Sequence, residues 1–281
     1  MILLQAILLG LVQGLTEFLP ISSTAHLRVL PALLGWDDPG AAFSAVIQLG
    51  TVAAVLVYFR TDLLRMARGV ERGIRSRDLI GDSDARQALL VVAGSVPIIV
   101  AGLLFKDFIT TRLRSLYIIA AALIVVGLLM ALAEVLSARR AAREATASSI
   151  RFGDAVVIGL AQACALIPGV SRSGSTLAMG LFRGQGRAEA ARFSFLLSIP
   201  AITGAGVLAA FDLGRIAAEG DSHLHMAVGT LVAFVTGYAT IGGLISFLTR
   251  RSVHGFVAYR LLLGMALFVL SWMGLLPPGA S

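Results

Sequence analysis

The residues best suited to do chemistry lie in two short polar segments, each set within an apolar stretch. Both segments follow one order: Gly-x-x-Gln, a few apolar residues, a proline and then a cluster of hydroxyl side chains. The first runs over Gly10–His26 and the second over Gly159–Thr176. Polar groups in such apolar surroundings are costly, so their presence indicates a functional site.

The second segment has the groups needed to bind an anion. Pro168 and Gly169 precede a run that contains Ser171, Arg172, Ser173 and Thr176. A guanidinium group offers planar, paired donors to phosphate, and the free N–H groups at a helix N-terminus attract negative charge. The alternative is that the hydroxyl groups only cap a helix while Arg172 reaches toward water.

The first segment adds a carboxylate, an amide and an imidazole. Gln13 and Glu17 are four residues apart, so they share one helix face, and their oxygens suit Mg²⁺ or Ca²⁺ bridged to a phosphate. Alternatively, Glu17 is protonated or pairs with Arg172. His26, close to Ser22 and Ser23, could act as general base, general acid or nucleophile. Together the two segments suit the phosphate group of a lipid.

The composition indicates an all-α integral membrane protein. The chain has 281 residues, of which 57% are hydrophobic and 14% charged, well below the charge of an ordinary soluble domain. Six apolar stretches are long enough to span a bilayer, the last only if it tolerates Arg260. They cover residues 41–59, 87–105, 115–133, 193–211, 226–249 and 255–276.

The distribution of positive charge predicts the topology. Most Lys and Arg residues fall in four connections, at 60–86, 139–151, 183–192 and 250–251. This is the positive-inside bias of a membrane protein, so the net charge of +7 gives no reason to expect nucleic-acid binding. With these connections in the cytoplasm, 60–86 is a cytoplasmic loop, and residues 1–34 and 154–182 must each enter and leave on one face.

The predicted fold is therefore one membrane domain over residues 1–281, with six transmembrane helices and two re-entrant helix pairs. Residues 1–136 form one repeat and residues 153–276 a second repeat of opposite orientation, each with a re-entrant pair and three spans. Inverted-topology repeats place their site near the midplane, where broken helices meet. This pattern is common in transporters, so transport of a lipid phosphate or another anion, or flipping of such a lipid, is the alternative function.

Other polar residues give weaker signals. His223 and His225 fit a solvated external loop better than a metal site. Arg260 could face the cavity or pair with a carboxylate, and Gln48 could bond across helices. Cys164, the single cysteine, fits small core filler.

The two segments resemble the signatures of the bacterial undecaprenyl-diphosphatase (bacitracin-resistance) family, and the resemblance extends to Phe193–Leu197 and to Tyr259–Arg260. It implies hydrolysis of undecaprenyl diphosphate to the monophosphate, which recycles the lipid carrier for the cell wall and confers bacitracin resistance. It also implies a divalent cation, Mg²⁺ or Ca²⁺, a bacterial plasma (inner) membrane location and a cleft open to the outer, periplasmic face. A homodimer fits the family as well.

The resemblance also implies roles for the residues. Arg172 would hold the diphosphate with Ser22, Ser171, Ser173 and Thr176. Glu17 would position the metal with Gln13, although many relatives have glutamate at the position of Gln13, which weakens its metal binding. His26 is nucleophile or general acid–base, and Ser23 orients the phosphate or is itself the nucleophile; the sequence leaves this choice open.

Overall fold

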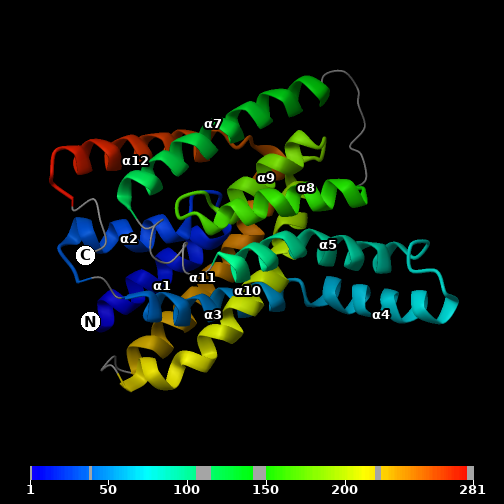
Figure 1. Ribbon diagram of the computed structural model, residues 1–281, viewed down its shortest axis with the longest axis horizontal. Coiled ribbons are helices and arrows are strands. Elements are labelled where there is room, and N and C mark those ends of the chain that lie inside the picture. Colours follow the sequence, from blue (N-terminus) through cyan, green and yellow to red (C-terminus); the bar gives the residue numbers. More distant parts are fainter. Residues whose placement is uncertain (1, 38–39, 106–114, 142–149, 219–222, 277–281) are drawn as a thin grey trace.

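The computed structural model describes residues 2–37, 40–105, 115–141, 150–218 and 223–276. These residues are almost entirely helical, which confirms the all-α class (Figure 1). The helices are α1 (Leu3–Phe18), α2 (Ser23–Leu34), α3 (Gly40–Tyr58), α4 (Arg60–Ser76), α5 (Ser83–Leu104), α7 (Leu116–Ala141), α8 (Phe152–Ala163), α9 (Arg172–Phe182), α10 (Arg187–Ala218), α11 (His223–Arg250) and α12 (His254–Trp272), with a 3₁₀ turn η1 (Cys164–Leu166).

Several helices have the length and composition of membrane spans. Within the described residues, α5, α7, α11 and α12 qualify directly, and α3 with α4 qualifies as a fifth, bent by 65°. The long helix α10 covers the remaining predicted span and carries Pro200 in its interior. The chain is thus a multi-pass membrane protein, with helices at all six places where the apolar stretches predicted them.

Two helix pairs are interrupted near the middle of the molecule and run toward opposite ends. In Figure 1, α1 and α2 extend from the centre to the left, and α8 and α9 extend to the right. Pro20 and Pro168 lie in the interruptions, where a missing N–H and steric restriction of the preceding residue end a helix. Each pair is a hairpin with its break at the centre.

The glycine of each Gly-x-x-Gln motif marks a close helix crossing. A Cβ atom on Gly10 of α1 would lie 2.4 Å from the carbonyl oxygen of Gly229 in α11, and one on Gly159 of α8 would lie 2.1 Å from that of Gly94 in α5. Any larger side chain would push these helices apart. The first helix of each hairpin therefore packs on a helix of the opposite half of the chain. The inverted repeat over residues 1–136 and 153–276 stays a prediction.

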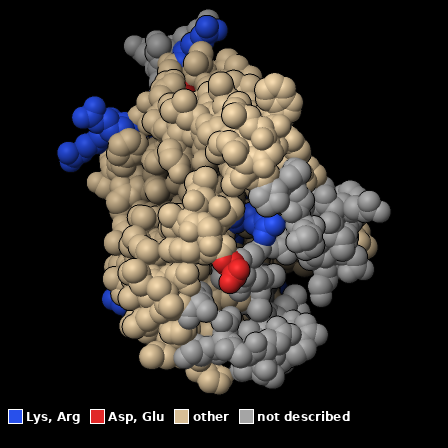
Figure 2. Space-filling view, turned by 90° about the vertical axis from the view of Figure 1, so that its left-hand side faces the viewer, with Lys and Arg blue, Asp and Glu red and all other residues tan. Residues whose placement is uncertain are grey.

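Ion pairs gather at the end of the molecule where the arginine-rich connections meet. Arg183 pairs with Asp154, Arg187 with the buried Glu134, and Arg192 with Asp62. Arg140 donates to the carbonyl oxygens of Leu181 and Phe182 at the end of α9. The opposite end, which faces the viewer in Figure 2, shows a mostly uncharged surface. The described residues of three predicted connections, at 60–86, 139–151 and 183–192, thus lie close together. This arrangement fits the positive-inside prediction.

The connection over residues 60–86, which was predicted as a cytoplasmic loop, contains a helix that the sequence analysis did not identify. Residues 60–76 form α4, which packs antiparallel to α5 through Met66, Gly69 and Gly73 and exposes arginines on its other side. Arg72 binds Asp82, and this hydrogen bond lowers the pKa of the Asp82 carboxyl. The pattern was missed because α4 is amphipathic, with charge on one face only.

Candidate active site

The two hairpin breaks meet at the centre of the molecule and share an unusual backbone feature. Ser22 precedes α2 with φ 77°, and Ser171 precedes α9 with φ 70°. Positive φ is uncommon for residues other than glycine, and it persists only where the surrounding structure enforces it. Residues with such a strained backbone are concentrated at functional sites. The two serines occupy equivalent places, each one residue before the helix that leaves the break.

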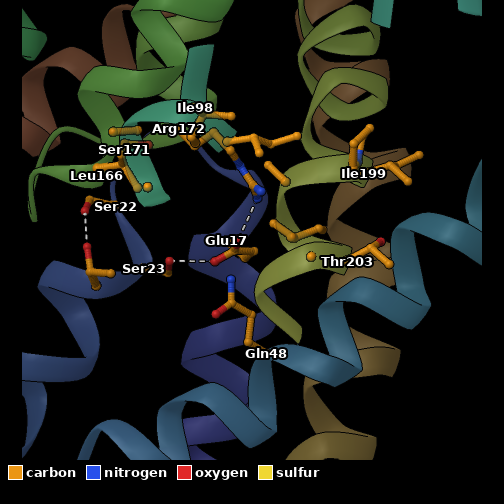
Figure 3. A pocket seen from close by; sticks show the side chains of 18 of the residues that line it. Glu17, Ser22, Ser23, Gln48, Ile98, Leu166, Ser171, Arg172, Ile199 and Thr203 are labelled. Atoms are coloured by element: carbon orange, nitrogen blue, oxygen red, sulfur yellow. Dashed lines mark hydrogen bonds and ion pairs between the residues drawn. The ribbon is translucent and has the colours of Figure 1, made fainter. Parts of the chain in front are cut away.

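Glu17 lies between the two breaks and receives hydrogen bonds from both (Figure 3). Its Oε1 accepts from the guanidinium of Arg172 at 2.6 Å, and its Oε2 accepts from the Ser23 hydroxyl at 2.6 Å. The Gln13 amide donates to the same Oε2 at 3.1 Å. The Glu17 and Arg172 side chains are only 8% and 13% exposed, so loss of either one would leave the other as an uncompensated buried charge.

A cavity of about 920 Å³ opens beside this ion pair. Its polar wall contains five predicted site residues, namely Glu17, Ser22, Ser23, Ser171 and Arg172, together with Thr24 and Gln48. Its apolar wall comes from the ends of α5 and η1 and the middle of α10, including Ile98, Leu103, Leu166, Ile199 and Ile202. A charged group at one end and an apolar lining elsewhere fit a lipid with an anionic head.

The hydroxyl groups at the start of α9 form hydrogen bonds with the protein around the cavity. The Ser171 hydroxyl caps the helix by accepting from the Gly174 N–H at 3.2 Å. Ser173 donates to the Leu19 carbonyl oxygen at 3.0 Å and so joins the two breaks. Thr176 is fully buried and hydrogen-bonds Ser194 of α10 at 2.5 Å. Phosphate binding by Ser173 and Thr176 stays a prediction, because both have protein partners behind the cavity wall.

His26 lies one turn along α2 from Ser22 and faces α12. Its Nδ1 is 2.7 Å from the Ser22 carbonyl oxygen, which can only accept, so Nδ1 carries a hydrogen and donates it. Its Nε2 is 2.6 Å from the Tyr259 hydroxyl, and the two rings are stacked. His26 thus has its hydrogen bonds to Ser22 and Tyr259 rather than to Glu17 or Arg172.

Sequence reasoning did not identify Tyr259 as a partner of His26 or Gln48 as part of the cavity wall. The signal for Tyr259 was its place beside Arg260 in the resemblance, but nothing in the sequence shows which face of the last helix meets α2. Thr51, which accepts from Gln13 at 3.4 Å, was also missed. Contacts between distant helices depend on how the helices cross, and periodicity does not give that crossing.

The residues around Glu17 fit a shared cation site better than a closed protein cage. Among the described residues, no three His, Cys, Asp or Glu side chains come together as metal ligands. Glu17 lines the cavity and offers a hard carboxylate ligand. The Gln13 amide nitrogen donates to Glu17, so the amide oxygen would become a second ligand only after the amide group rotates. Mg²⁺ is commonly bound by one or two carboxylates together with substrate phosphates, so these residues would hold it only jointly with a phosphate.

Fold and site together define an all-α membrane protein in which residues of two opposed hairpins meet as a buried ion pair beside an apolar cavity. Comparison with known proteins identifies the family to which the chain belongs. Residues 6–266 match the family model described as "Bacitracin resistance protein BacA", and the chain belongs to this family.

Relatives from several bacteria match over nearly the whole chain. A protein of Chloroherpeton thalassium is 50% identical over 97% of this chain and 98% of its own length. One of Myxococcus xanthus is 52% identical over 99% of this chain and 92% of its own length, and one of Chlorobium phaeobacteroides is 51% identical over 95% and 96%. All three are named "Undecaprenyl-diphosphatase".

Proposed function

We propose that the chain hydrolyses undecaprenyl diphosphate to undecaprenyl phosphate and inorganic phosphate. The observation that carries this proposal is the Glu17–Arg172 pair, brought from opposite hairpins to the polar end of an apolar cavity. Family membership and the names of the relatives agree with it, and they favour hydrolysis over the transport considered above. By this activity the protein recycles the lipid carrier for cell-wall synthesis and confers bacitracin resistance.

Arg172 and the N-terminus of α9 bind the diphosphate. A guanidinium group donates paired hydrogen bonds to phosphate oxygens, and the helix N-terminus adds partial positive charge. The phosphate competes with Glu17 for Arg172, so substrate binding loosens the 2.6 Å ion pair and frees one carboxylate oxygen. The apolar wall from α5 and α10 accommodates the first isoprene units of the tail.

Ser23 is the proposed nucleophile and Glu17 its base. The Ser23 hydroxyl lines the cavity and donates to Glu17 at 2.6 Å. Its oxygen forms a bond to the terminal phosphorus while the bond from phosphorus to the bridging oxygen breaks, and its proton passes to Glu17. Undecaprenyl phosphate leaves, and water then releases inorganic phosphate from the serine. Electrostatic stabilisation by Arg172 is the main contribution to rate.

His26 is the second candidate for the covalent step, as general acid–base or nucleophile, once Tyr259 releases its Nε2. Trapping with a ³²P-labelled terminal phosphate separates the two nucleophiles, because phosphoserine survives acid and phosphohistidine does not. Acid-stable label that disappears in Ser23→Ala supports Ser23, whereas acid-labile label that disappears in His26→Asn supports His26.

A divalent cation, Mg²⁺ or Ca²⁺, belongs to the same proposal. Glu17 and Gln13 would hold it together with the diphosphate, and it would neutralise negative charge on the phosphates. We further propose the bacterial inner membrane as the location, a cavity open to the periplasmic face, and a homodimer as the assembled form.

The decisive experiment is phosphate release by the purified protein. A long-chain isoprenoid diphosphate is the substrate, with and without chelator and with Mg²⁺ or Ca²⁺ restored. Release that stops with chelator and returns with the cation supports the activity and the cation. If chelator does not change phosphate release, the proposed role of the cation is contradicted. If no phosphate is released under any metal condition, the proposed activity is contradicted.

A further inference from the structure

Arg260 is a fully buried arginine in the middle of α12, and it reaches both hairpin breaks. Its Nη1 donates to the carbonyl oxygen of Pro20 at 3.1 Å in the first break. Its Nη2 donates to the carbonyl oxygens of Gly169 at 2.9 Å and Val170 at 3.1 Å in the second. Longer contacts, each of 3.3 Å, reach the carbonyl oxygens of Leu123 and Ala122 in α7.

The acceptors explain why an arginine is present. Carbonyl groups in a broken helix have no partner within the helix, and the bilayer interior provides no water to satisfy them. A guanidinium group offers five N–H donors in one rigid plane. One side chain can therefore satisfy carbonyl groups of two breaks and a neighbouring helix, and it fixes the distance between them while doing so.

The charge of Arg260 lies against the first turn of α9. Its Nη1 is 3.4 Å from the place where a Cβ atom on Gly174 would lie. The ion pairs within the described part of the chain do not include Arg260. A buried positive charge without a carboxylate partner is expensive, and a bound anion at the start of α9 would offset part of that cost.

We propose that Arg260 is the positioning residue of this site. It fixes the two breaks relative to each other through their main-chain carbonyl groups, and it adds positive charge behind the phosphate. Arg260 does not line the cavity, so it acts through the geometry of Glu17 and Arg172. This inference rests on the proposed hydrolase function, because a displacement of 1 Å between reacting groups is enough to slow catalysis by about 100-fold.

Two variants separate geometry from charge. Arg260→Lys keeps the charge but has three donors on a flexible stem, so it cannot bridge both breaks. We expect kcat to fall by about 10- to 100-fold, with KM changed by less than about threefold. Arg260→Gln is neutral and remains compatible with burial if the lysine variant does not fold. We expect it to lower kcat similarly and also to raise KM, because it removes the charge behind the phosphate.

Hydrogen exchange of backbone amides tests the positioning without using activity. In both variants, residues 18–24 and 167–175 should exchange faster than in the wild type, while α4 stays unchanged. The matched control is Arg187→Lys, which alters a partly buried arginine paired with Glu134 at the arginine-rich end. The control should keep wild-type kcat and wild-type exchange in both breaks.

Two results would overturn the inference. One is a folded variant with wild-type kcat and wild-type exchange in the breaks, and the other is faster exchange in one break only. If the wild type releases no phosphate but both breaks still exchange faster in the variants, the proposed function fails and the positioning role of Arg260 stands.

Discussion

The two hairpin breaks are built alike but carry opposite chemistry. In each hairpin, the first helix has a glycine at a close helix crossing, and the break that follows contains a proline and ends at a serine with positive φ. The first segment, however, contains the carboxylate of Glu17, and the second contains the guanidinium group of Arg172. The shared scaffold brings the two breaks together, and the difference between them places a carboxylate beside a guanidinium group at the proposed diphosphate site.

The two motif glutamines show the same divergence. Gln13 donates to Glu17 at 3.1 Å and to Thr51 at 3.4 Å. Gln162, its counterpart in α8, is fully buried, and neither of its side-chain polar atoms has a hydrogen-bond partner in the described structure. The glutamine beside the acid has a defined polar role, and the matching glutamine in the other hairpin does not.

Removal of the Arg172 guanidinium group should reduce phosphate release more than any other single change in the two hairpins. Arg172→Ala takes away the phosphate donor and leaves Glu17 buried without its charged partner. We expect kcat/KM for phosphate release to fall by about 1,000-fold, or about 4 kcal/mol of transition-state stabilisation. Size-exclusion profile and helical circular dichroism should stay as in the wild type, and turnover within threefold of the wild type would contradict the assignment of Arg172.

Loss of the hydrogen bond between His26 and Tyr259 of α12 should reduce kcat less than loss of the Arg172 guanidinium group. Tyr259→Phe removes the hydroxyl group 2.6 Å from His26 Nε2 and keeps the stacked ring. We expect at most about a tenfold change in kcat, comparable to the loss of one hydrogen bond of about 1 kcal/mol. The pH profile of kcat is the measurement. If His26 takes part in proton transfer, the profile shifts with the loss of Tyr259; an unshifted profile would restrict His26 to shaping the turn at Ser22.

Substitution of the two motif glutamines should have the smallest effect on activity. It compares the two hairpins directly, because the same change is made in each. Gln13→Leu removes a donor to Glu17 and should lower kcat by several-fold, which corresponds to the loss of one hydrogen bond of about 1 kcal/mol. Gln162→Leu replaces an unpartnered buried amide with an apolar side chain of similar size. It should keep wild-type kcat and raise thermal stability, by about 1 kcal/mol or more. Equal effects of the two changes on kcat would contradict the functional difference between the hairpins.

Much of the fold was predictable because apolar length and charge bias report directly on membrane insertion. The breaks at Pro20 and Pro168 were also predictable, since proline and clustered hydroxyl groups interrupt apolar helices for local reasons. The helix α4 was not, because its alternating apolar and basic residues read as a polar connection when counted by charge alone.

The candidate site likewise contains some residues that the sequence predicted and some contacts that it did not. Glu17, Arg172 and Ser23 were predicted from residue types that are costly at membrane depth, and the structure brings their side chains together. The Arg260 contacts to both breaks and the Tyr259 contact to His26 were not predicted. Both depend on how α12 packs against α2 and α7, a consequence of three-dimensional packing that no short sequence window contains.

One measurement tests most directly whether the two hairpins act on a single diphosphate group: a double-mutant cycle on phosphate release with Arg172→Lys and Glu17→Gln. If both residues act as one unit, each single change should cost about 100-fold and the double variant should cost little more than either one. If the two losses multiply to about 10,000-fold, the residues act independently, and the site shared between the hairpins is contradicted.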